Sequence, residues 1–140
     1  MSNPVPAPLA IGQPSENMVT VTHLVYALHA FAVFSALVGS TMIIFGFIAS
    51  LPSIAAVVLN YWNQTAVRGT WLESHFRWQI RTFWFAVLWV VIAGLMAVTV
   101  IGLPFAFVLM LLAGLWILYR IVRGWWVLTQ RAPLPMPPQG

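Results

Sequence analysis

The sequence predicts an all-α integral membrane protein with four transmembrane helices, arranged as two hairpins, and an amphipathic interfacial helix before the third. Composition is the first observation: 61% of the 140 residues are hydrophobic and 6% are charged, whereas a soluble domain carries about 25% charged residues. The second is that the apolar residues form long runs without charge, and a helix needs about 20 such residues to cross the hydrocarbon core.

Both ends of the chain are rich in proline and differ in composition from the apolar runs. Residues 1–18 contain four prolines and no positive charge, so they do not match a secretory signal. We expect them to form a disordered tail. Residues 132–140 predict a second proline-rich tail, with polyproline II character. The helical membrane domain is expected over residues 19–131.

The first apolar stretch is long enough for two spans. As a single helix, residues 19–62 would be about 66 Å long, which is twice the roughly 30 Å hydrocarbon core. We therefore expect spans over 19–39 and 42–62. A second interpretation ends a long first helix near Ser50 and starts a shorter, re-entrant helix at Pro52.

The second apolar stretch predicts the other hairpin. Two uncharged runs over residues 82–101 and 104–119 are separated by Gly102 and a leucine, with Pro104 directly after them. Glycine and proline interrupt a helix. We therefore expect two spans joined by a tight turn.

The arginines predict the orientation in the membrane. Three precede the third span and three follow the fourth: Arg68, Arg77, Arg81, Arg120, Arg123 and Arg131. A hairpin returns the chain to the same side, and the positive-inside rule makes this side cytoplasmic. We expect a multi-pass protein of the bacterial inner membrane, with the arginine-rich loop and the C-terminus in the cytoplasm. Four spans would place the N-terminus there too, and three would place it outside.

The residues before the third span predict an interfacial helix over 70–81. Thr70 and Glu73 have the spacing of a capping box, in which Glu73 reaches back to the Thr70 amide. Glu73, Arg77 and Arg81 recur every four residues, so they share a face, and Glu73 can pair with Arg77. Tryptophans and arginines at this depth suit the headgroup region. A second interfacial segment is expected over 120–130.

These two segments supply the candidate site, which is a surface for a partner protein or for lipid headgroups. Its residues are Trp71, Glu73, His75, Arg77, Trp78, Arg81, Trp84, Arg120, Arg123, Trp125 and Trp126. The competing interpretation is a plain membrane anchor, which needs only basic and aromatic residues at this depth.

The composition speaks against several kinds of chemistry. Without cysteine, the chain has no thiolate and no cysteine-ligated metal. Its spans lack the acidic groups that transporters use. Two facing histidines, such as His23 and His75, could ligate a haem, but no motif supports this. His29 lies inside the first span and is a functional candidate, or else a neutral imidazole bonded to a neighbouring helix. We expect no catalytic residue, no metal, no cofactor and no nucleic-acid partner.

Three blocks of sequence resemble a known family. Residues 67–85, VRGTWLESHFRWQIRTFWF, are similar to the hallmark of small bacterial membrane proteins that are classed as a domain of unknown function and grouped with Tic-type chloroplast import components. Residues 23–30 and 119–125 are similar to it as well. The resemblance implies a small helical-bundle membrane protein of bacterial type and no established activity. The stretch between His29 and Asn60 is longer here than is usual in that family.

These observations predict a non-enzymatic membrane protein that works by association. It would be an accessory or scaffold subunit, or an assembly factor, of a larger membrane complex, with a membrane-protein partner or further copies of itself. One alternative is a small oligomeric channel or transporter. Another is a protein that binds anionic lipid through arginines: Arg77, Arg81, Arg120 and Arg123.

Overall fold

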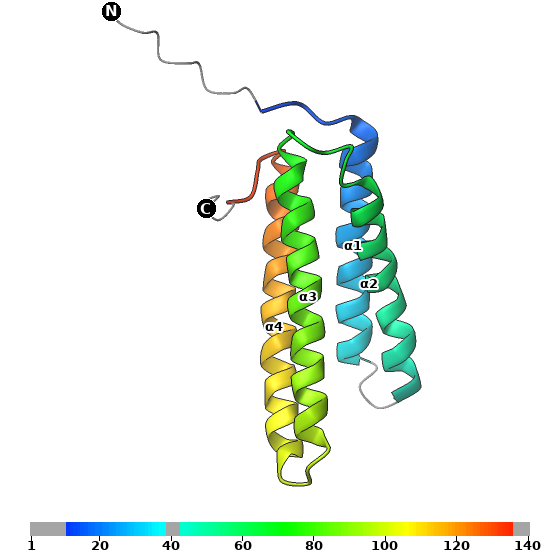
Figure 1. The fold of residues 1–140 in the computed structure, drawn as a ribbon, viewed down its shortest axis with the longest axis vertical. Helices are drawn as coiled ribbons and strands as arrows, with labels where there is room; N and C mark the ends of the chain where they lie inside the picture. Colours follow the sequence, from blue (N-terminus) through cyan, green and yellow to red (C-terminus); the bar gives the residue numbers. More distant parts are fainter. Residues whose placement is uncertain (1–10, 39–42, 136–140) are drawn as a thin grey trace, which may run out of the picture.

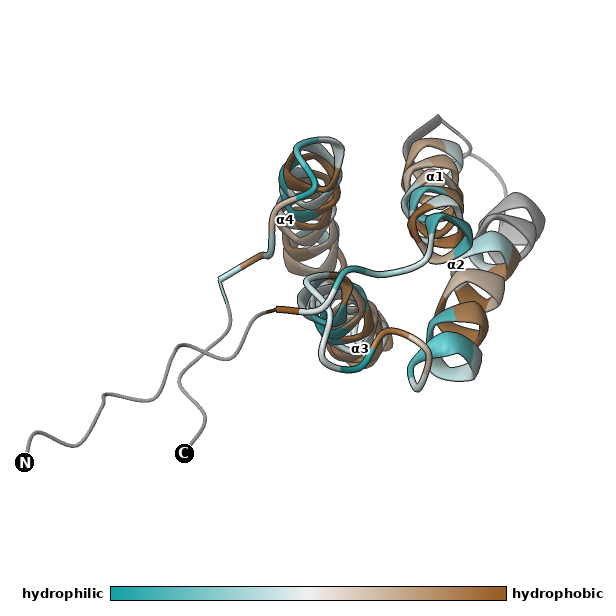
Figure 2. Cartoon of the chain, turned by 90° about the horizontal axis from the view of Figure 1, so that it is seen from above, coloured by the Kyte–Doolittle hydropathy of each residue, from teal (hydrophilic) through white to brown (hydrophobic). Residues whose placement is uncertain are grey.

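The described part of the chain consists of four helices that form two antiparallel hairpins. The structure is a computed structural model that describes residues 11–38 and 43–135, except for the side chains of residues 37–38 and 43–49. The helices are α1 (Glu16–Val38), α2 (Ile43–Asn63), α3 (Leu72–Ala97) and α4 (Gly102–Thr129) (Figure 1). Viewed along the helices, α1 lies beside α2 and α3 lies beside α4 (Figure 2).

The all-α prediction is confirmed, and three helices are long and apolar enough to cross a membrane. Their candidate spans are Glu16–Ala36, Leu72–Ala97 and Gly102–Thr129. The third of the expected four spans corresponds to α3, and the fourth to α4. A first helix that continues to Ser50 is not formed, because α1 ends at Val38 and Pro52 lies inside α2.

A separate interfacial helix before the third span is not confirmed. Residues 72–81 are the first turns of the continuous helix α3, and residues 120–129 are the last turns of α4. Within α3, one face of these turns is buried against protein: Leu72, Ser74, His75, Phe76 and Gln79. No glycine or proline interrupts the chain between Arg81 and Thr82, so the amphipathic stretch and the apolar stretch form one continuous helix.

The start of α3 also differs from the predicted capping box. The Thr70 hydroxyl donates to the carbonyl of Val67 (2.7 Å), and the Glu73 carboxylate accepts from the amide of Gly69 (2.9 Å). Gly69 has a φ of 74°, a conformation that glycine adopts without steric cost. The carboxylate therefore caps the loop one residue earlier than the sequence pattern predicts.

Parts of both predicted tails are ordered and pack on the same end of the bundle. Residues 16–18 belong to α1, and the amide of Gly12 donates to the carbonyl of Gly69 (2.9 Å). At the other end of the chain, Leu134 is buried and its amide donates to the Ser74 hydroxyl (2.9 Å). Residues 1–10 and 136–140 of the predicted tails lie outside the described residues.

The large buried side chains gather at this end of the bundle. The cluster consists of Val19, Tyr26, Val67, Trp71, Leu72, Phe76, Ile121 and Leu128. Farther along, the buried residues between α3 and α4 are small, namely Ala93, Ala106 and Ala113. Small residues let helix backbones approach closely inside a membrane. The larger apolar side chains of this half, such as Leu95 and Phe107, point outward.

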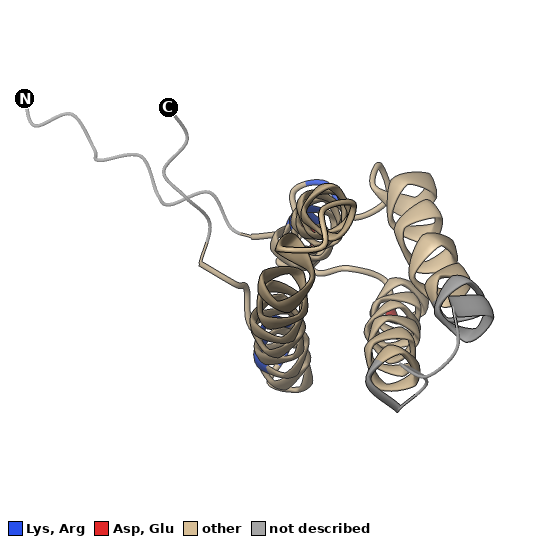
Figure 3. Cartoon of the chain, turned by 90° about the horizontal axis from the view of Figure 1, so that it is seen from below, with Lys and Arg blue, Asp and Glu red and all other residues tan. Residues whose placement is uncertain are grey.

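All charged side chains lie toward the end where α1 begins and α4 finishes, which we call the charged end. No charged residue occurs between Arg81 and Arg120. In Figure 3 the charged residues are coloured and the view is from the opposite end. From Gly102 to Arg120, α4 covers about 27 Å, close to the roughly 30 Å of a hydrocarbon core.

Candidate functional site

A buried polar core joins the two hairpins at the charged end. The hydroxyl of Tyr26 on α1 lies 3.0 Å from Nδ1 of His75 on α3, and Nε2 of His75 lies 2.8 Å from the carbonyl oxygen of Ala132. Because a carbonyl oxygen can only accept, Nε2 carries the hydrogen, and Nδ1 accepts from the tyrosine hydroxyl. Both ring nitrogens of His75 are thus bonded inside the core.

The ring of Tyr26 lies directly against the backbone of α4 at Gly124. A Cβ atom added to Gly124 would meet the hydroxyl and ring of Tyr26. The ring also stacks on Trp125, with 6.5 Å between ring centroids. This close approach at Gly124 was not predicted from the sequence, although a glycine inside a helix can indicate close packing. At Gly94, in contrast, an added Cβ would have no neighbour within 4 Å.

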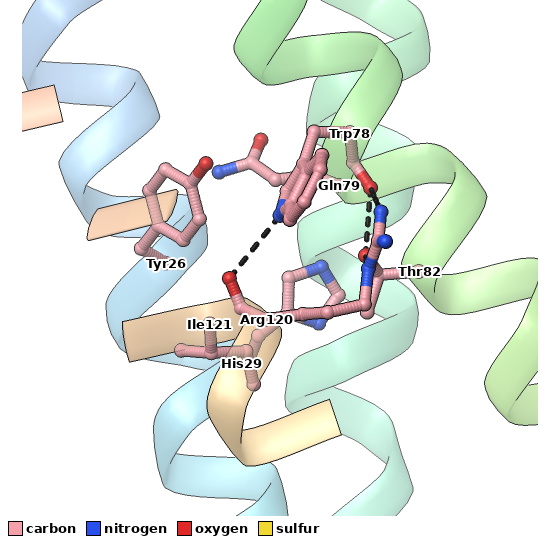
Figure 4. A pocket seen from close by; sticks show the side chains of 7 residues that line it. All are labelled: Tyr26, His29, Trp78, Gln79, Thr82, Arg120 and Ile121. Atoms are coloured by element: carbon pink, nitrogen blue, oxygen red, sulfur yellow. Dashed lines mark hydrogen bonds between the residues drawn. The ribbon is translucent and has the colours of Figure 1, made fainter. Parts of the chain in front are cut away.

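Arg120 connects α3 and α4 through its whole side chain. Its Cζ lies 3.6 Å from the ring centroid of Trp78 and 5.0 Å from that of Trp116. Its Nε donates to the hydroxyl of Thr82 (2.7 Å), and Trp78 Nε1 donates to the carbonyl of Arg120 (3.1 Å) (Figure 4). This cation–π pair therefore holds the two helices together instead of facing the surface.

A small cavity of about 10 Å³ lies between these groups. Seven residues line it, as Figure 4 shows: Tyr26, His29, Trp78, Gln79, Thr82, Arg120 and Ile121. His29 is 7% exposed and Gln79 is 2% exposed. Nε2 of His29 and both amide atoms of Gln79 have no hydrogen-bond partner among the described residues. The accessible surface of the cavity is apolar, so these unpartnered atoms belong to residues around it but do not face into it.

The contacts of the histidines bear on the predicted role of His29 and on the haem hypothesis for His23 and His75. Nδ1 of His29 lies 2.7 Å from the hydroxyl of Ser53 on α2. This contact agrees with the prediction of an imidazole bonded to a neighbouring helix. His23 accepts from Nε1 of Trp125 (3.0 Å). Since both ring nitrogens of His75 are bonded within the protein, none is free for a haem iron. The described residues hold no group of three or more histidine or acidic side chains placed to bind a metal ion.

Each of the two glutamates forms an ion pair with an arginine. The expected pair of Glu73 with Arg77 is present at 2.6 Å. Glu16 accepts two bonds from Arg131, at 2.7 and 2.9 Å, and its carboxylate raises the pKa of Arg131 above the usual value. This second pair joins the start of α1 to the chain after α4, 115 residues apart, so no local pattern could reveal it.

Ten of the eleven predicted site residues divide into a buried set and an exposed set, and the eleventh, Glu73, is half-buried and paired with Arg77. Trp71 and His75 are in the core, and Trp78, Arg120 and Trp125 are partly buried and bonded inside the bundle. The exposed set lies on two helices: Arg77, Arg81 and Trp84 on α3, and Arg123 and Trp126 on α4.

On α3 the exposed residues continue into a stripe that runs most of the length of the helix. We call it the α3 stripe: Arg77, Arg81, Trp84, Leu88, Val91 and Leu95. Its spacing of three and four residues places the side chains on one face. At its middle, Nε1 of Trp84 donates to the hydroxyl of Tyr61 on α2 (2.9 Å). Trp62, the residue after Tyr61 on α2, is 82% exposed.

On α4 the exposed residues line a shallow groove of about 510 Å³. We call it the α4 groove: Leu115, Leu118, Tyr119, Val122, Arg123 and Trp126. Nη1 of Arg123 donates to the hydroxyl of Tyr119 (2.8 Å). Trp126 at the upper end is 67% exposed.

Comparison with known proteins finds no matching family model, no similar curated protein and no similar solved structure. The fold and the site define a small helical protein with three helices apolar enough for a membrane and a polar core at one end. The family resemblance of residues 67–85 stays a prediction.

Proposed function

We propose that this is a multi-pass protein of the bacterial inner membrane that works by association, as an accessory or scaffold subunit or an assembly factor of a larger membrane complex. The observation that carries the proposal is the α3 stripe. Helix α3 contacts all three other helices, yet this face remains uncovered from Arg77 to Leu95.

The stripe has the spacing and chemistry of a face that receives another transmembrane helix. Alternation of three and four residues is the pattern of left-handed helix packing. Arg81 forms no ion pair with a glutamate, so it can meet an acidic group of a partner. Trp84 offers a large, stiff aromatic surface of the kind that dominates binding energy at interfaces.

The arrangement in the membrane that goes with this function has the charged end in the cytoplasm and α2 as a fourth span. Helix α2 has 21 residues and no charge, which suits the length required. Since the chain contains no cysteine, single cysteines can report the topology. A membrane-impermeant maleimide added from the periplasm should label Thr99→Cys and leave Gln64→Cys unlabelled. Labelling of Gln64→Cys alone would reverse the orientation.

Affinity purification in mild detergent from the native membrane, followed by mass spectrometry, tests the association. We expect a stoichiometric companion that is retained with the wild-type chain and lost with Trp84→Ala combined with Leu88→Ala. Trp126→Ala is the matched control, because this tryptophan is also exposed but lies on α4. A wild-type chain that purifies alone or only with its own copies would overturn the proposal, as would equal retention by the stripe and control variants.

A further inference from the structure

The positive charge that remains after ion pairing lies at the top of the α4 groove and near it. The two glutamates pair with Arg77 and Arg131, and Glu73 also interacts electrostatically with Arg68 in the loop before α3. Among the described residues, Arg81, Arg120 and Arg123 have no carboxylate partner. The guanidinium of Arg120 lies over the rings of Trp78 and Trp116, and its Nε donates to the Thr82 hydroxyl. Arg81 and Arg123 are both close enough to interact electrostatically with Arg120.

Arg123 is the arginine that combines free charge with an apolar surface. It bonds to the Tyr119 hydroxyl, and a guanidinium has five N–H donors, so several remain for a ligand. No carboxylate lines the α4 groove. Below Arg123 the lining is aliphatic, with Leu115, Leu118 and Val122. An anionic head followed by an apolar chain therefore matches the groove from top to bottom.

The position of the groove across the bilayer also matches a lipid. From Leu115 to Trp126 the helix rises about 16 Å, which is about half of a 30 Å hydrocarbon core. With Arg120 near the boundary of that core, Arg123 and Trp126 lie at headgroup level, where both residue types are favoured. Leu115 and Leu118 then lie beside the acyl chains of the same leaflet.

We propose that the α4 groove binds one anionic phospholipid, with its phosphate on Arg123 and the Tyr119 hydroxyl and an acyl chain along Leu118 and Leu115. A zwitterionic lipid is disfavoured because its cationic group would approach the arginines around Arg120. The site is on a different helix from the α3 stripe and does not depend on the proposed function.

Native mass spectrometry of the purified protein, with phosphatidylglycerol or phosphatidylcholine added, tests this site. We expect one phosphatidylglycerol to be retained at concentrations where phosphatidylcholine is not. Arg123→Gln should weaken its binding by about fivefold, because one arginine near the headgroups contributes on this order. Trp126→Ala should weaken it as well and serves as the second variant if Arg123→Gln does not fold.

Two controls separate a specific site from general attraction. Arg68→Gln removes the same charge from the loop before α3, and Trp84→Ala removes a tryptophan from the α3 stripe; both should bind lipid as the wild type does. Equal retention of the two lipids, or an equal loss in Arg68→Gln and Arg123→Gln, would overturn the proposal. Complete displacement by inorganic phosphate would also overturn it, since the acyl chain would then contribute nothing.

Discussion

Gly124 is a position where one added methyl group should disturb the core at the charged end. In Gly124→Ala the new Cβ would collide with the ring of Tyr26, which is 1% exposed and cannot move outward freely. Overpacking of a core costs about 1–3 kcal/mol. If the ring shifts, the bond to His75 is lost as well, at about 0.5–1.5 kcal/mol. Alanine favours the helix by up to about 1 kcal/mol over glycine.

The expected net loss in the free energy of unfolding is therefore about 1–3 kcal/mol. Equilibrium unfolding in mixed micelles, followed by tryptophan fluorescence, measures it, because Trp125 stacks on the affected ring. Gly94→Ala is the control: it is the same substitution inside a helix, with no atom within 4 Å of the new methyl group. It should leave stability unchanged or raise it by up to about 1 kcal/mol.

Unfolding of Gly124→Ala and Gly94→Ala at the same denaturant concentration would show that the Tyr26 ring does not resist a methyl group at Gly124. A double-mutant cycle with Tyr26→Phe gives a further check. Because both changes act on the hydroxyl that bonds to His75, their costs should not add. Strict additivity would mean that Gly124 destabilises the protein through some contact other than Tyr26.

Two further substitutions follow from the contacts at the charged end. Arg120→Lys keeps the charge but loses the flat group that lies over Trp78 while donating to Thr82; we expect about 0.5–2 kcal/mol of destabilisation and an altered near-ultraviolet circular dichroism signal, whereas Arg68→Lys should change neither. Leu134→Ala removes a side chain that is 3% exposed and should cost about 2–5 kcal/mol in the same unfolding assay. A cost below that of the outward-facing Leu111→Ala would show that the segment after α4 does not hold the bundle.

The helices could be predicted because their signal is local. Charge-free runs of sufficient length led to four helices in two hairpins, and the spacing of Glu73 and Arg77 led to their ion pair, which is present. The turn expected near residues 39–42 lies outside the described residues. The length of α3 was underestimated because its amphipathic start was assigned to the membrane surface.

The burial of Trp71 and His75 could not be predicted for a different reason. A face of aromatic and polar residues looks the same in sequence whether lipid headgroups or protein will cover it. Here the cover comes from distant segments: Gln13 accepts from the indole of Trp71, and Ala132 accepts from His75. Their proline-rich surroundings predicted disorder, and contacts over more than 50 residues have no periodic pattern that could correct this.

The position of the core at the charged end determines which solvents can loosen the protein. Inside lipid, apolar helices gain little by touching each other, because acyl chains are equally apolar. The cluster around Phe76 and Leu128 lies instead beyond the stretch from Gly102 to Arg120 that matches a hydrocarbon core, where water competes for it and the hydrophobic effect operates. Urea, which acts from the aqueous phase, should therefore separate the two hairpins while α3 and α4, which are long and apolar enough to cross a membrane, stay paired. A change in bilayer thickness should alter the association of the hairpins far less.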